Sequence, residues 1–330
     1  MHRKARSGKG RKPWMRVISV AVFLWPCAAY AAESYPSRPI RMIVGSVPGS
    51  APDALARIVG QRLGEELGQQ FVVDNRAGAT GTIGAKYLAT AQPDGYTLGI
   101  VAAAFATTAS TMSLSYDVRK DFQAVAGIAS VPLILVVSPA SEVNSVSALV
   151  ALAKARRGAV NYASPGAGGL QHLVTEAFSQ LVGISMVHVP YKGGSQAVTA
   201  VAGGEVQLFF SGMPPALPLV NQGRLRALAV TTQKRYPSAP NVPTMQEAGY
   251  KSFEADNWHG IMAPINIPGA HVARINQVLS KVLATQDIKQ KFLVAGGEAQ
   301  WSSGAVFQKL VNAEVERWAK VAKAVGITPQ

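Results

Sequence analysis

Four loops rich in glycine, serine and proline are the places in this sequence where chemistry could occur, because each follows an apolar run and precedes a helical pattern. The first turn of a helix has N–H groups without intrahelical partners, and small residues let a ligand approach that main chain closely. Such loops favour an anion. We therefore expect one pocket lined mostly by main-chain N–H and hydroxyl groups. The loops are SVPGSAPD at 46–53, RAGATG at 76–81, SPGAGG at 164–169 and YKGGS at 191–195.

The first of these loops has the composition of a helix start. Gly49 permits a tight turn, and Pro52 suits the first turn of a helix because its missing N–H would have no partner there. Ser50 and Asp53 have the spacing of a capping box. The loop could serve only to begin a helix, or it could also hold an anion, and this stretch alone leaves both interpretations open.

Nucleotide-binding motifs do not match these loops. No Gly-Lys-Ser/Thr follows the first loop, so it is not a phosphate loop of the Walker kind. Gly78, Gly81 and Gly84 have the spacing GxxGxxG and not GxGxxG, and no acid ends a following strand. A dinucleotide site is therefore disfavoured.

A serine hydrolase is the enzymatic alternative. The stretch GGSQA at 193–197 resembles the nucleophile elbow GxSxG with its last glycine replaced, which makes Ser195 the candidate nucleophile. Such an enzyme would also need an acid and then a histidine, for which His259 or His271 could be proposed. The sequence lacks the HGGG motif that supplies an oxyanion hole. Its absence disfavours a hydrolase, and the family resemblance given below implies that Ser195 is a helix-start residue of a binding protein and that the chain is not an enzyme.

Metal and cofactor chemistry is not expected either. The five histidines have neither HxxxH nor HxH spacing, and the single cysteine, Cys27, belongs to the N-terminal segment. The sequence therefore predicts no catalytic residue, no metal site and no cofactor.

The N-terminal segment is typical of an export signal. Its first sixteen residues, MHRKARSGKGRKPWMR, hold seven Lys and Arg and no acid, and a short apolar run follows. Ala29 and Ala31 supply the small residues that a signal peptidase needs, so we predict a signal peptide at 1–31, cleavage after Ala31 and an exported protein. A membrane anchor is the alternative, but the run is shorter than the ~20 apolar residues of a span.

Loss of this segment changes the charge of the chain. The formal net charge of +14 falls by seven cations to +7 for residues 32–330. Such a charge can attract anions but does not by itself imply nucleic acid. No dense Lys/Arg cluster interleaved with aromatics occurs after the signal, so we expect no nucleic-acid partner.

Strand and helix patterns alternate along the remaining chain. The apolar runs are four to nine residues long and rich in Val, Ile and Leu, and helical stripes such as that at 51–68 separate several of them. This order predicts an α/β protein with parallel sheets covered on both faces, and two smaller sheets suit the length. Ligands bind at the carboxyl ends of such strands. The runs are 40–46, 69–75, 96–104, 133–138, 160–164, 185–191, 206–212 and 224–232.

Nine motifs in fixed order resemble the Bug-type solute receptors of tripartite tricarboxylate transporters, whose family is also called TctC-like. Among them are SVPGSAPDALAR, VDNRAGATGTIGA, YASPGAGGLQHLVTEAF, VHVPYKGGSQAVTAV and WHGIMAP. The resemblance covers nearly all of the chain from Tyr35. It implies a two-lobed periplasmic binding protein of the type II-like class, with a mostly parallel sheet in each lobe. Lobe 1 would comprise 32–134 and 258–330, lobe 2 would comprise 135–257, and crossing segments would lie near 132–139 and 257–264.

The resemblance also implies which residues bind the ligand and what the partners are. The lobes would close over a small carboxylate, and membrane subunits of a tripartite transporter, or a membrane sensor, would recognise the closed form of a monomer. First-lobe contacts would come from Ser46, Pro48, Gly49, Ser50, Ala79, Thr80, Ala103 and Ala104. Second-lobe contacts would come from Ser164, Gly166, Gly168, Tyr191, Gly193 and Ser211.

Two departures from the family pattern bear on specificity. Ser211 stands where receptors for amino acids or hydroxy acids often have an acid, so we predict a plain mono- or dicarboxylate as the ligand. The stretch FATT at 105–108 replaces a His and an Asn of many relatives and makes this wall more apolar. His172 follows the third loop and either touches the ligand or ties the loop down, and we favour the second role.

Overall fold

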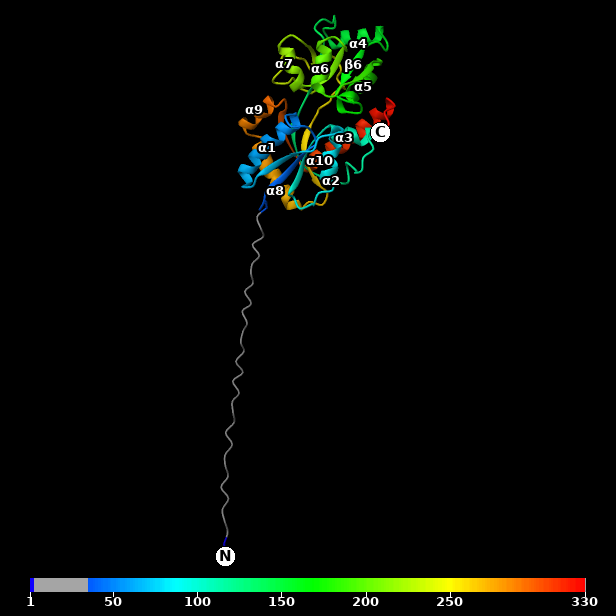
Figure 1. The fold of residues 1–330 in the computed structure, drawn as a ribbon. Coiled ribbons are helices and arrows are strands. Elements are labelled where there is room, and N and C mark those ends of the chain that lie inside the picture. The colour runs from blue at the N-terminus through cyan, green and yellow to red at the C-terminus, as the bar shows by residue number, and fades with distance from the viewer. Residues whose placement is uncertain (3–34, 330) are drawn as a thin grey trace. The chain divides into compact units, whose positions relative to one another are not determined.

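The computed structural model describes residues 1–2 and 35–329, and a compact unit begins at Tyr35 (Figure 1). The expected signal peptide lies outside the described residues except for Met1 and His2, as do its cleavage site and Cys27. In the described part of the chain, no helix combines the length and the apolar character that a membrane crossing requires.

The first sheet combines strands from both ends of the compact unit. Its six strands have the order β11-β4-β10-β3-β1-β2. β1 pairs in parallel with β2 and β3, whereas β10 is antiparallel to β3 and β4, and β11 is antiparallel to β4. The strands are β1 (Ile40–Val44), β2 (Phe71–Asn75), β3 (Thr97–Ala102), β4 (Phe122–Ser130), β10 (His259–Pro264) and β11 (Glu298–Ser303).

Helices cover both faces of this sheet (Figure 1). On one face α1, α8 and α9 contribute side chains such as Leu55 and Phe292 to a common core. On the other face α2, α3 and α10 contribute Leu88 and Trp318, among others, to a second core. The helices are α1 (Ala51–Leu67), α2 (Thr82–Ala89), α3 (Ala104–Thr111), α8 (Gly269–Val282), α9 (Gln286–Val294) and α10 (Gly304–Ala324), and a 3-10 turn, η1 (Ala79–Gly81), precedes α2.

The second sheet has five strands in the order β7-β6-β8-β5-β9. β6 pairs in parallel with β7 and β8, and β5 is antiparallel to β8 and β9. Helices α4 and α5 cover one face, and α6 and α7 cover the other. The elements are β5 (Leu133–Val137), α4 (Val146–Ala155), β6 (Asn161–Ser164), α5 (Leu170–Val182), β7 (Val187–Pro190), α6 (Gly194–Ala202), β8 (Leu208–Gly212), α7 (Met213–Asn221) and β9 (Arg226–Val230).

The chain crosses between the two sheets twice. It leaves the first sheet after β4 and returns to it before β10, and a bridge between Pro132 and Asp256 joins the two crossings. The ranges predicted for the crossings, 132–139 and 257–264, were wrong for most of their length, because 133–137 form β5 and 259–264 form β10. Each crossing is short because an apolar strand follows it almost at once. The limits predicted for the two lobes stay a prediction.

The α/β class with two sheets is confirmed, and the pairings refine it. Each sheet is mixed, with parallel pairs on one side and antiparallel pairs on the other, where mostly parallel sheets were expected. All eight apolar runs contain strands, but β4, β10 and β11 were not predicted. These three are the antiparallel strands of the first sheet. β11 has the sequence EAQWSS and an edge position, so its polar pattern resembles that of a loop.

Candidate ligand-binding site

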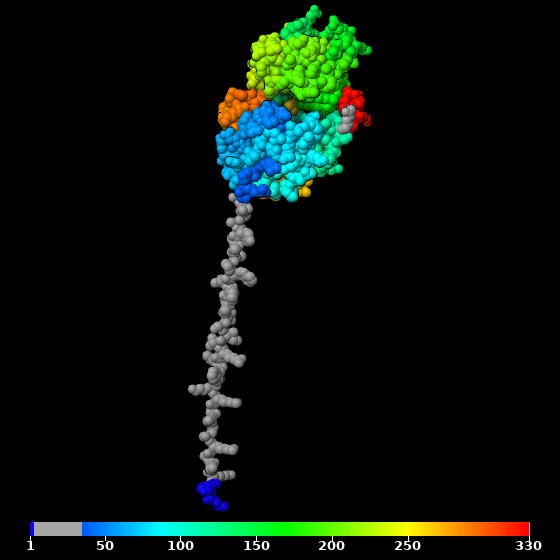
Figure 2. Space-filling model, in the orientation of Figure 1, coloured from blue at the N-terminus to red at the C-terminus, as the bar shows by residue number. Residues whose placement is uncertain are grey.

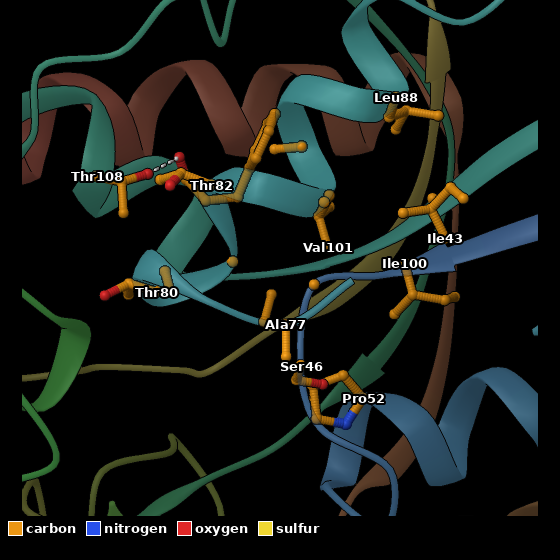
Figure 3. Close-up of a pocket in the computed structure, with 18 of the residues that line it drawn as sticks. Ile43, Ser46, Pro52, Ala77, Thr80, Thr82, Leu88, Ile100, Val101 and Thr108 are labelled. Atoms are coloured by element: carbon orange, nitrogen blue, oxygen red, sulfur yellow. Dashed lines mark hydrogen bonds between the residues drawn. The ribbon is translucent and has the colours of Figure 1, made fainter. Parts of the chain in front are cut away.

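A cavity of about 320 Å³ lies at the carboxyl ends of β1 and β3, where the first two predicted loops meet (Figure 3). Four segments of the chain line it: the end of β1 with the β1–α1 loop, the stretch from Ala77 into α2, the end of β3 with the start of α3, and Tyr116 between α3 and β4. The open edge of a sheet at the carboxyl ends of parallel strands is where α/β proteins bind ligands. The position of the cavity therefore agrees with the expected place for chemistry.

The cavity changes in character from its mouth to its floor. At the mouth Val47, Ala77 and Thr80 are exposed, and Ser46 and Thr82 are half-buried. The floor is buried and apolar, and Figure 3 shows several of its side chains. A ligand would therefore meet hydroxyl and main-chain groups first and hydrocarbon behind them. The apolar floor residues are Ile43, Leu88, Ile100, Val101 and Phe105.

Glycines hold the loops of the mouth close together. A Cβ added to Gly84, at the start of α2, would lie 2.9 Å from the Cα of Gly45, at the end of β1. A Cβ added to Gly45 would likewise lie 2.9 Å from the Cα of Gly81. Contacts this short with backbone atoms leave room only for glycine. The two strand-to-helix loops thus touch main chain to main chain.

The helix starts around the cavity have no side-chain caps. This holds for the N-caps of α1, α2 and α3, namely Ser50, Gly81 and Ala103. The same is true of α8 and α9, whereas Ser145 caps α4 and Ser303 caps α10. A missing side-chain cap leaves first-turn N–H groups to other partners, which an anion can supply. Because α1, α2 and α3 also begin beside the cavity, their first turns are the candidate anion-binding groups.

The capping box predicted for Ser50 and Asp53 was wrong in its details. The Asp53 carboxylate accepts from the Gly49 N–H at 2.9 Å, one residue earlier than a capping box requires. The Ser50 hydroxyl donates to the Val47 carbonyl at 2.7 Å and lies 2.6 Å from the Ser46 hydroxyl. Because the Ser50 proton is used on Val47, the Ser46 hydroxyl is the donor to Ser50. The loop is therefore held by its own side chains before any ligand binds.

Asp53 connects this loop to β2. Its carboxylate accepts from Arg57 Nε and, at 2.9 Å, from Asn75 Nδ2. Burial opposes the charge of Asp53, but hydrogen bonds from Arg57, Gly49 and Asn75 outweigh it and hold the pKa of this carboxyl below its ordinary value. Asp53 is thus a buried anion whose hydrogen bonds fix the β1–α1 loop to the end of β2.

Three of the predicted first-lobe contacts line the cavity: Ser46, Thr80 and Ala104. Gly49 and Ser50 instead line a more open pocket with Pro214 of α7 and Lys291 of α9. Pro48 and Ala79 are exposed beside the mouth, and Ala103 is fully buried. The binding role of all these residues stays a prediction.

The third loop rests on a pair of stacked histidines. His172 Nδ1 accepts from the Gly168 N–H at 3.0 Å, and its ring lies 3.8 Å from that of His188. The fully buried Ser164 hydroxyl shares a hydrogen bond of 2.6 Å with His188 Nε2. The expectation that His172 ties the loop down is therefore confirmed. Burial, and then the neighbouring His188, lower the pKa of His172 to about 4.

The remaining second-sheet residues are separated from the cavity of the first sheet. Tyr191 lies with Ser195 in a shallow depression that also includes Glu205, and no histidine lines it in the described structure. Gly193 begins α6, and the fully buried Ser211 hydroxyl donates to the Gly212 carbonyl. Together with Ser164, Gly166 and Gly168, these residues do not line the cavity of the first sheet, and their contact with a ligand stays a prediction.

The two histidines proposed for a hydrolase do not join Ser195. His259 lies in β10 and is fully buried, and its Nδ1 lies 2.9 Å from the Asn257 carbonyl. His271 lies in α8 and stacks on Tyr35 with 3.7 Å between ring centroids. Among the described residues, no group of three His, Cys, Asp or Glu is arranged to hold a metal ion.

The two sheets and their helices touch across the expected cleft. Thr111 of α3 donates to the Gly168 carbonyl of the third loop at 3.1 Å. Gly296, after α9, lies against Pro214 of α7, where a Cβ would be 2.3 Å from the proline ring. Figure 2 shows this boundary, with the orange α9 beside the yellow-green surface of the second sheet. The structure therefore brings loops of both sheets together.

Two α/β sheets, each flanked by helices and joined to the other by two crossings, define the class of two-lobed periplasmic binding proteins. The family model described as "Tripartite tricarboxylate transporter family receptor" matches residues 55–327. The chain belongs to this receptor family, as the nine motifs indicated.

Known relatives agree with this assignment. Protein BugT of Bordetella pertussis is 36% identical over 302 residues, which cover 91% of this chain and 93% of BugT. The structure of R. palustris Rpa4515 with adipate has a TM-score of 0.80 and 36% identity, and covers 90% of this chain and 100% of that one. The structure of MatC from Rhodopseudomonas palustris with bound malate has a TM-score of 0.75 and 27% identity, with 87% and 99% covered.

Sequence reasoning missed the floor of the cavity. Leu88 and Tyr116 line it, yet neither belongs to one of the four loops. A buried Leu in a helix has the same local pattern whether it faces a core or a cavity. The one signal available was the apolar stretch at 105–108, which supplies Phe105 and Thr108 to the wall.

Proposed function

We propose that this protein is a periplasmic receptor that captures a small carboxylate between its two lobes and delivers it, unchanged, to the membrane subunits of a tripartite transporter. The observation that carries the proposal is the cavity at the starts of α1, α2 and α3, whose mouth offers main-chain and hydroxyl groups. Membership of the receptor family supports it, as do the adipate and malate of two related structures.

The carboxylate would bind at the mouth, between Ser46 and Thr80. The Ser46 hydroxyl now donates to the neutral oxygen of Ser50 at 2.6 Å. An ionised acceptor forms a stronger hydrogen bond than a neutral one, so a carboxylate would compete successfully for this donor. Helix-start dipoles of α1 and α2 add a further attraction for negative charge.

Hinge closure would couple binding to recognition by the membrane subunits. The two short crossings are the only covalent links between the sheets within the described chain, so they are the natural hinges. A ligand that touches loops of both lobes stabilises the closed state by its differential affinity for it. The contact between Thr111 and Gly168 supports such a closed arrangement.

Thermal-shift screening of the purified protein against mono- and dicarboxylates tests this function. A ligand at about one hundred times its Kd stabilises the folded state by about 2.7 kcal/mol, which corresponds to a rise in Tm of roughly 4 °C for a chain of this size. We expect at least one carboxylate to give such a rise without any added metal. The proposal fails if no carboxylate stabilises the protein at millimolar concentration, or if a ligand is chemically converted.

A further inference from the structure

The turn before α2 has a strained backbone where it borders the cavity. Four consecutive residues, Gly78 to Gly81, have positive φ angles of 130°, 45°, 57° and 90°. Glycine adopts such angles freely, whereas a residue with a Cβ is destabilised there by contact with a neighbouring carbonyl oxygen. Ala79 and Thr80 are the two residues of this turn that have a Cβ, so both are held in an unfavourable conformation.

Thr80 is the more unusual of the two because it is β-branched. Its φ of 57° and ψ of 28° lie in the left-handed region, where a β-branched residue is a rare outlier. In the described part of the chain, the one further non-glycine residue with a positive φ is Asn266, at 68°. Asparagine tolerates this conformation because its short polar side chain can form local hydrogen bonds. Thr80 therefore occupies a position that glycine would fill with less strain.

Close packing keeps the turn in this shape. The Gly81 N–H donates to the Gly78 carbonyl at 2.9 Å, and the Thr82 hydroxyl donates to the Ala79 carbonyl at 2.9 Å. A Cβ added to Gly45 would lie 2.9 Å from the Cα of Gly81, so the turn also lies directly against the end of β1. It cannot relax without losing these hydrogen bonds and its contact with β1. Backbone strain that the surroundings enforce in this way is concentrated at functional sites.

The Thr80 hydroxyl is free at the mouth of the cavity. Thr80 is exposed, and Figure 3 shows its side chain apart from the apolar floor around Ile100. The hydroxyls of Ser46, Thr82 and Thr108 line the same cavity and donate to protein acceptors. That of Thr80 has no partner in the described structure, although its residue also lines the cavity. The one unused threonine or serine hydroxyl of the cavity thus belongs to the strained residue.

From these observations we infer that Thr80 is a determinant of carboxylate affinity, whose hydroxyl donates to an oxygen of the bound acid. The inference rests on the proposed function and adds to it a side-chain donor that lowers the stability of the fold. Glycine at this position would relieve the strain, but it would also remove the donor. An ionised oxygen forms a stronger hydrogen bond than a neutral one, so a carboxylate gains more from this hydroxyl than a neutral ligand does.

Three substitutions of Thr80 separate the effect of the hydroxyl from that of the strain. Calorimetry with adipate, malate and hexanoate measures affinity, and thermal unfolding without ligand measures Tm. Thr80→Val keeps the branched shape and loses the hydroxyl, so the acids should bind about tenfold to a hundredfold more weakly. Thr80→Ser keeps the hydroxyl and should bind them within about threefold of the unmodified protein. Thr80→Gly removes both, so affinity should fall as in Thr80→Val while Tm rises by about 1–3 °C.

Asn266→Gly is the matched control. Asn266 is also exposed and has a left-handed backbone, but it lies between β10 and α8 and does not line the cavity. This variant should leave the affinity for all three acids unchanged, and it should raise Tm by no more than Thr80→Gly does. A higher Tm together with weaker binding, seen at position 80 and not at position 266, cannot arise from a general destabilisation of the fold.

Three results would overturn the inference while the proposed function stands. If Thr80→Val binds the acids as tightly as the unmodified protein does, the hydroxyl makes no contact with the ligand. If Thr80→Gly lowers Tm, the residue is not strained. If Asn266→Gly weakens binding as much as Thr80→Gly does, the loss of affinity does not come from the cavity. Failure of all three acids to bind the unmodified protein at millimolar concentration would overturn the proposed function as well.

Discussion

The imidazole rings of His172 and His188 stack almost parallel, with 3.8 Å between their centroids and 11° between their planes. Both rings hold the loop 164–169 in place. His172 accepts a hydrogen bond from the Gly168 N–H, and His188 shares a hydrogen bond with the Ser164 hydroxyl. Tyr162 extends the stack and donates to Glu176. Two neutral rings can lie this close, whereas two cations could not.

Acidification should therefore weaken the second sheet and its loop. Burial lowers the pKa of His172 to about 4 in the folded protein, against an ordinary value of 6.5. Between pH 6.5 and pH 4 the His172 side chain is protonated more readily in the unfolded chain than in the folded protein. The free energy of unfolding should therefore fall as pH falls from 6.5 towards 4. We expect a loss on the order of 1–2 kcal/mol from this residue after solvent screening.

Urea unfolding at pH 7 and pH 5 measures this effect. The variant His172→Gln keeps an acceptor for the Gly168 N–H but does not titrate, so its stability should depend less on pH than that of the unmodified protein. An unchanged pH dependence in the variant would show that His172 does not titrate as described.

Gly84 is predicted to be intolerant of a side chain. Its Cβ would meet the backbone of Gly45 at 2.9 Å, so Gly84→Ala must push the start of α2 away from β1. We expect a destabilisation of about 1–3 kcal/mol and weaker carboxylate binding, because the mouth of the cavity opens. Gly269→Ala at the start of α8 is the control, since nothing lies within 4 Å of its added Cβ. Equal stability of the two variants would contradict the close approach.

Asp53→Asn should destabilise the protein by about 1–3 kcal/mol at pH 7, because a buried acceptor of several hydrogen bonds loses its charge. The pKa of Asp53 is lowered in the folded state, so its contribution is present above the ordinary value of 3.8 and is lost as pH falls below it. The matched control is Asp287→Asn, whose carboxylate forms an exposed pair with Lys291 and should contribute roughly 0.5 kcal/mol or less. Denaturation curves with similar midpoints for both variants would argue against the role of Asp53.

Thr111→Val tests the contact between the lobes. The single proton of the Thr111 hydroxyl is shared between two carbonyl acceptors, Gly168 on the second-sheet side and Thr107 in its own helix, each at 3.1 Å. Its loss should disfavour the closed state by about 0.5–1.5 kcal/mol and weaken ligand binding about twofold to tenfold. Small-angle scattering without ligand should show a larger radius of gyration for the variant. The closure model would lose its support if affinity and radius were both unchanged.

Much of the fold could be predicted because its parallel strands are continuous apolar runs. The run at 40–46 ends in a small-residue loop and then a helix stripe, and the structure has β1 and α1 at these places. β4 and β10 could not be predicted in the same way. β4 alternates apolar residues with small ones in FQAVAGIAS, and β10 lies inside a motif that was assigned to a crossing. Both segments are strands because of tertiary pairing, since β10 pairs with β3 on one side and with β4 on the other.

The candidate site was predictable at its mouth and not at its floor. Ser46 and Thr80 line the cavity because glycine-rich turns place main chain at a helix start, which is a local property of the sequence, whereas the expectation for Ala104 came from the family resemblance alone. Tyr116 reaches the same cavity from the segment between α3 and β4. Its position depends on packing against Phe122, and no spacing rule in the sequence reports such a contact.

The proposed receptor binds a small acid through its ionised carboxylate and releases the molecule chemically unchanged. Calorimetric titration with a carboxylic acid that binds, beside its neutral methyl ester, followed by NMR of the recovered ligand, tests this claim most directly. We expect the acid to bind at least about a hundredfold more tightly than the ester, and both to be recovered intact. Equal affinity for the ester, or its hydrolysis, would contradict the account.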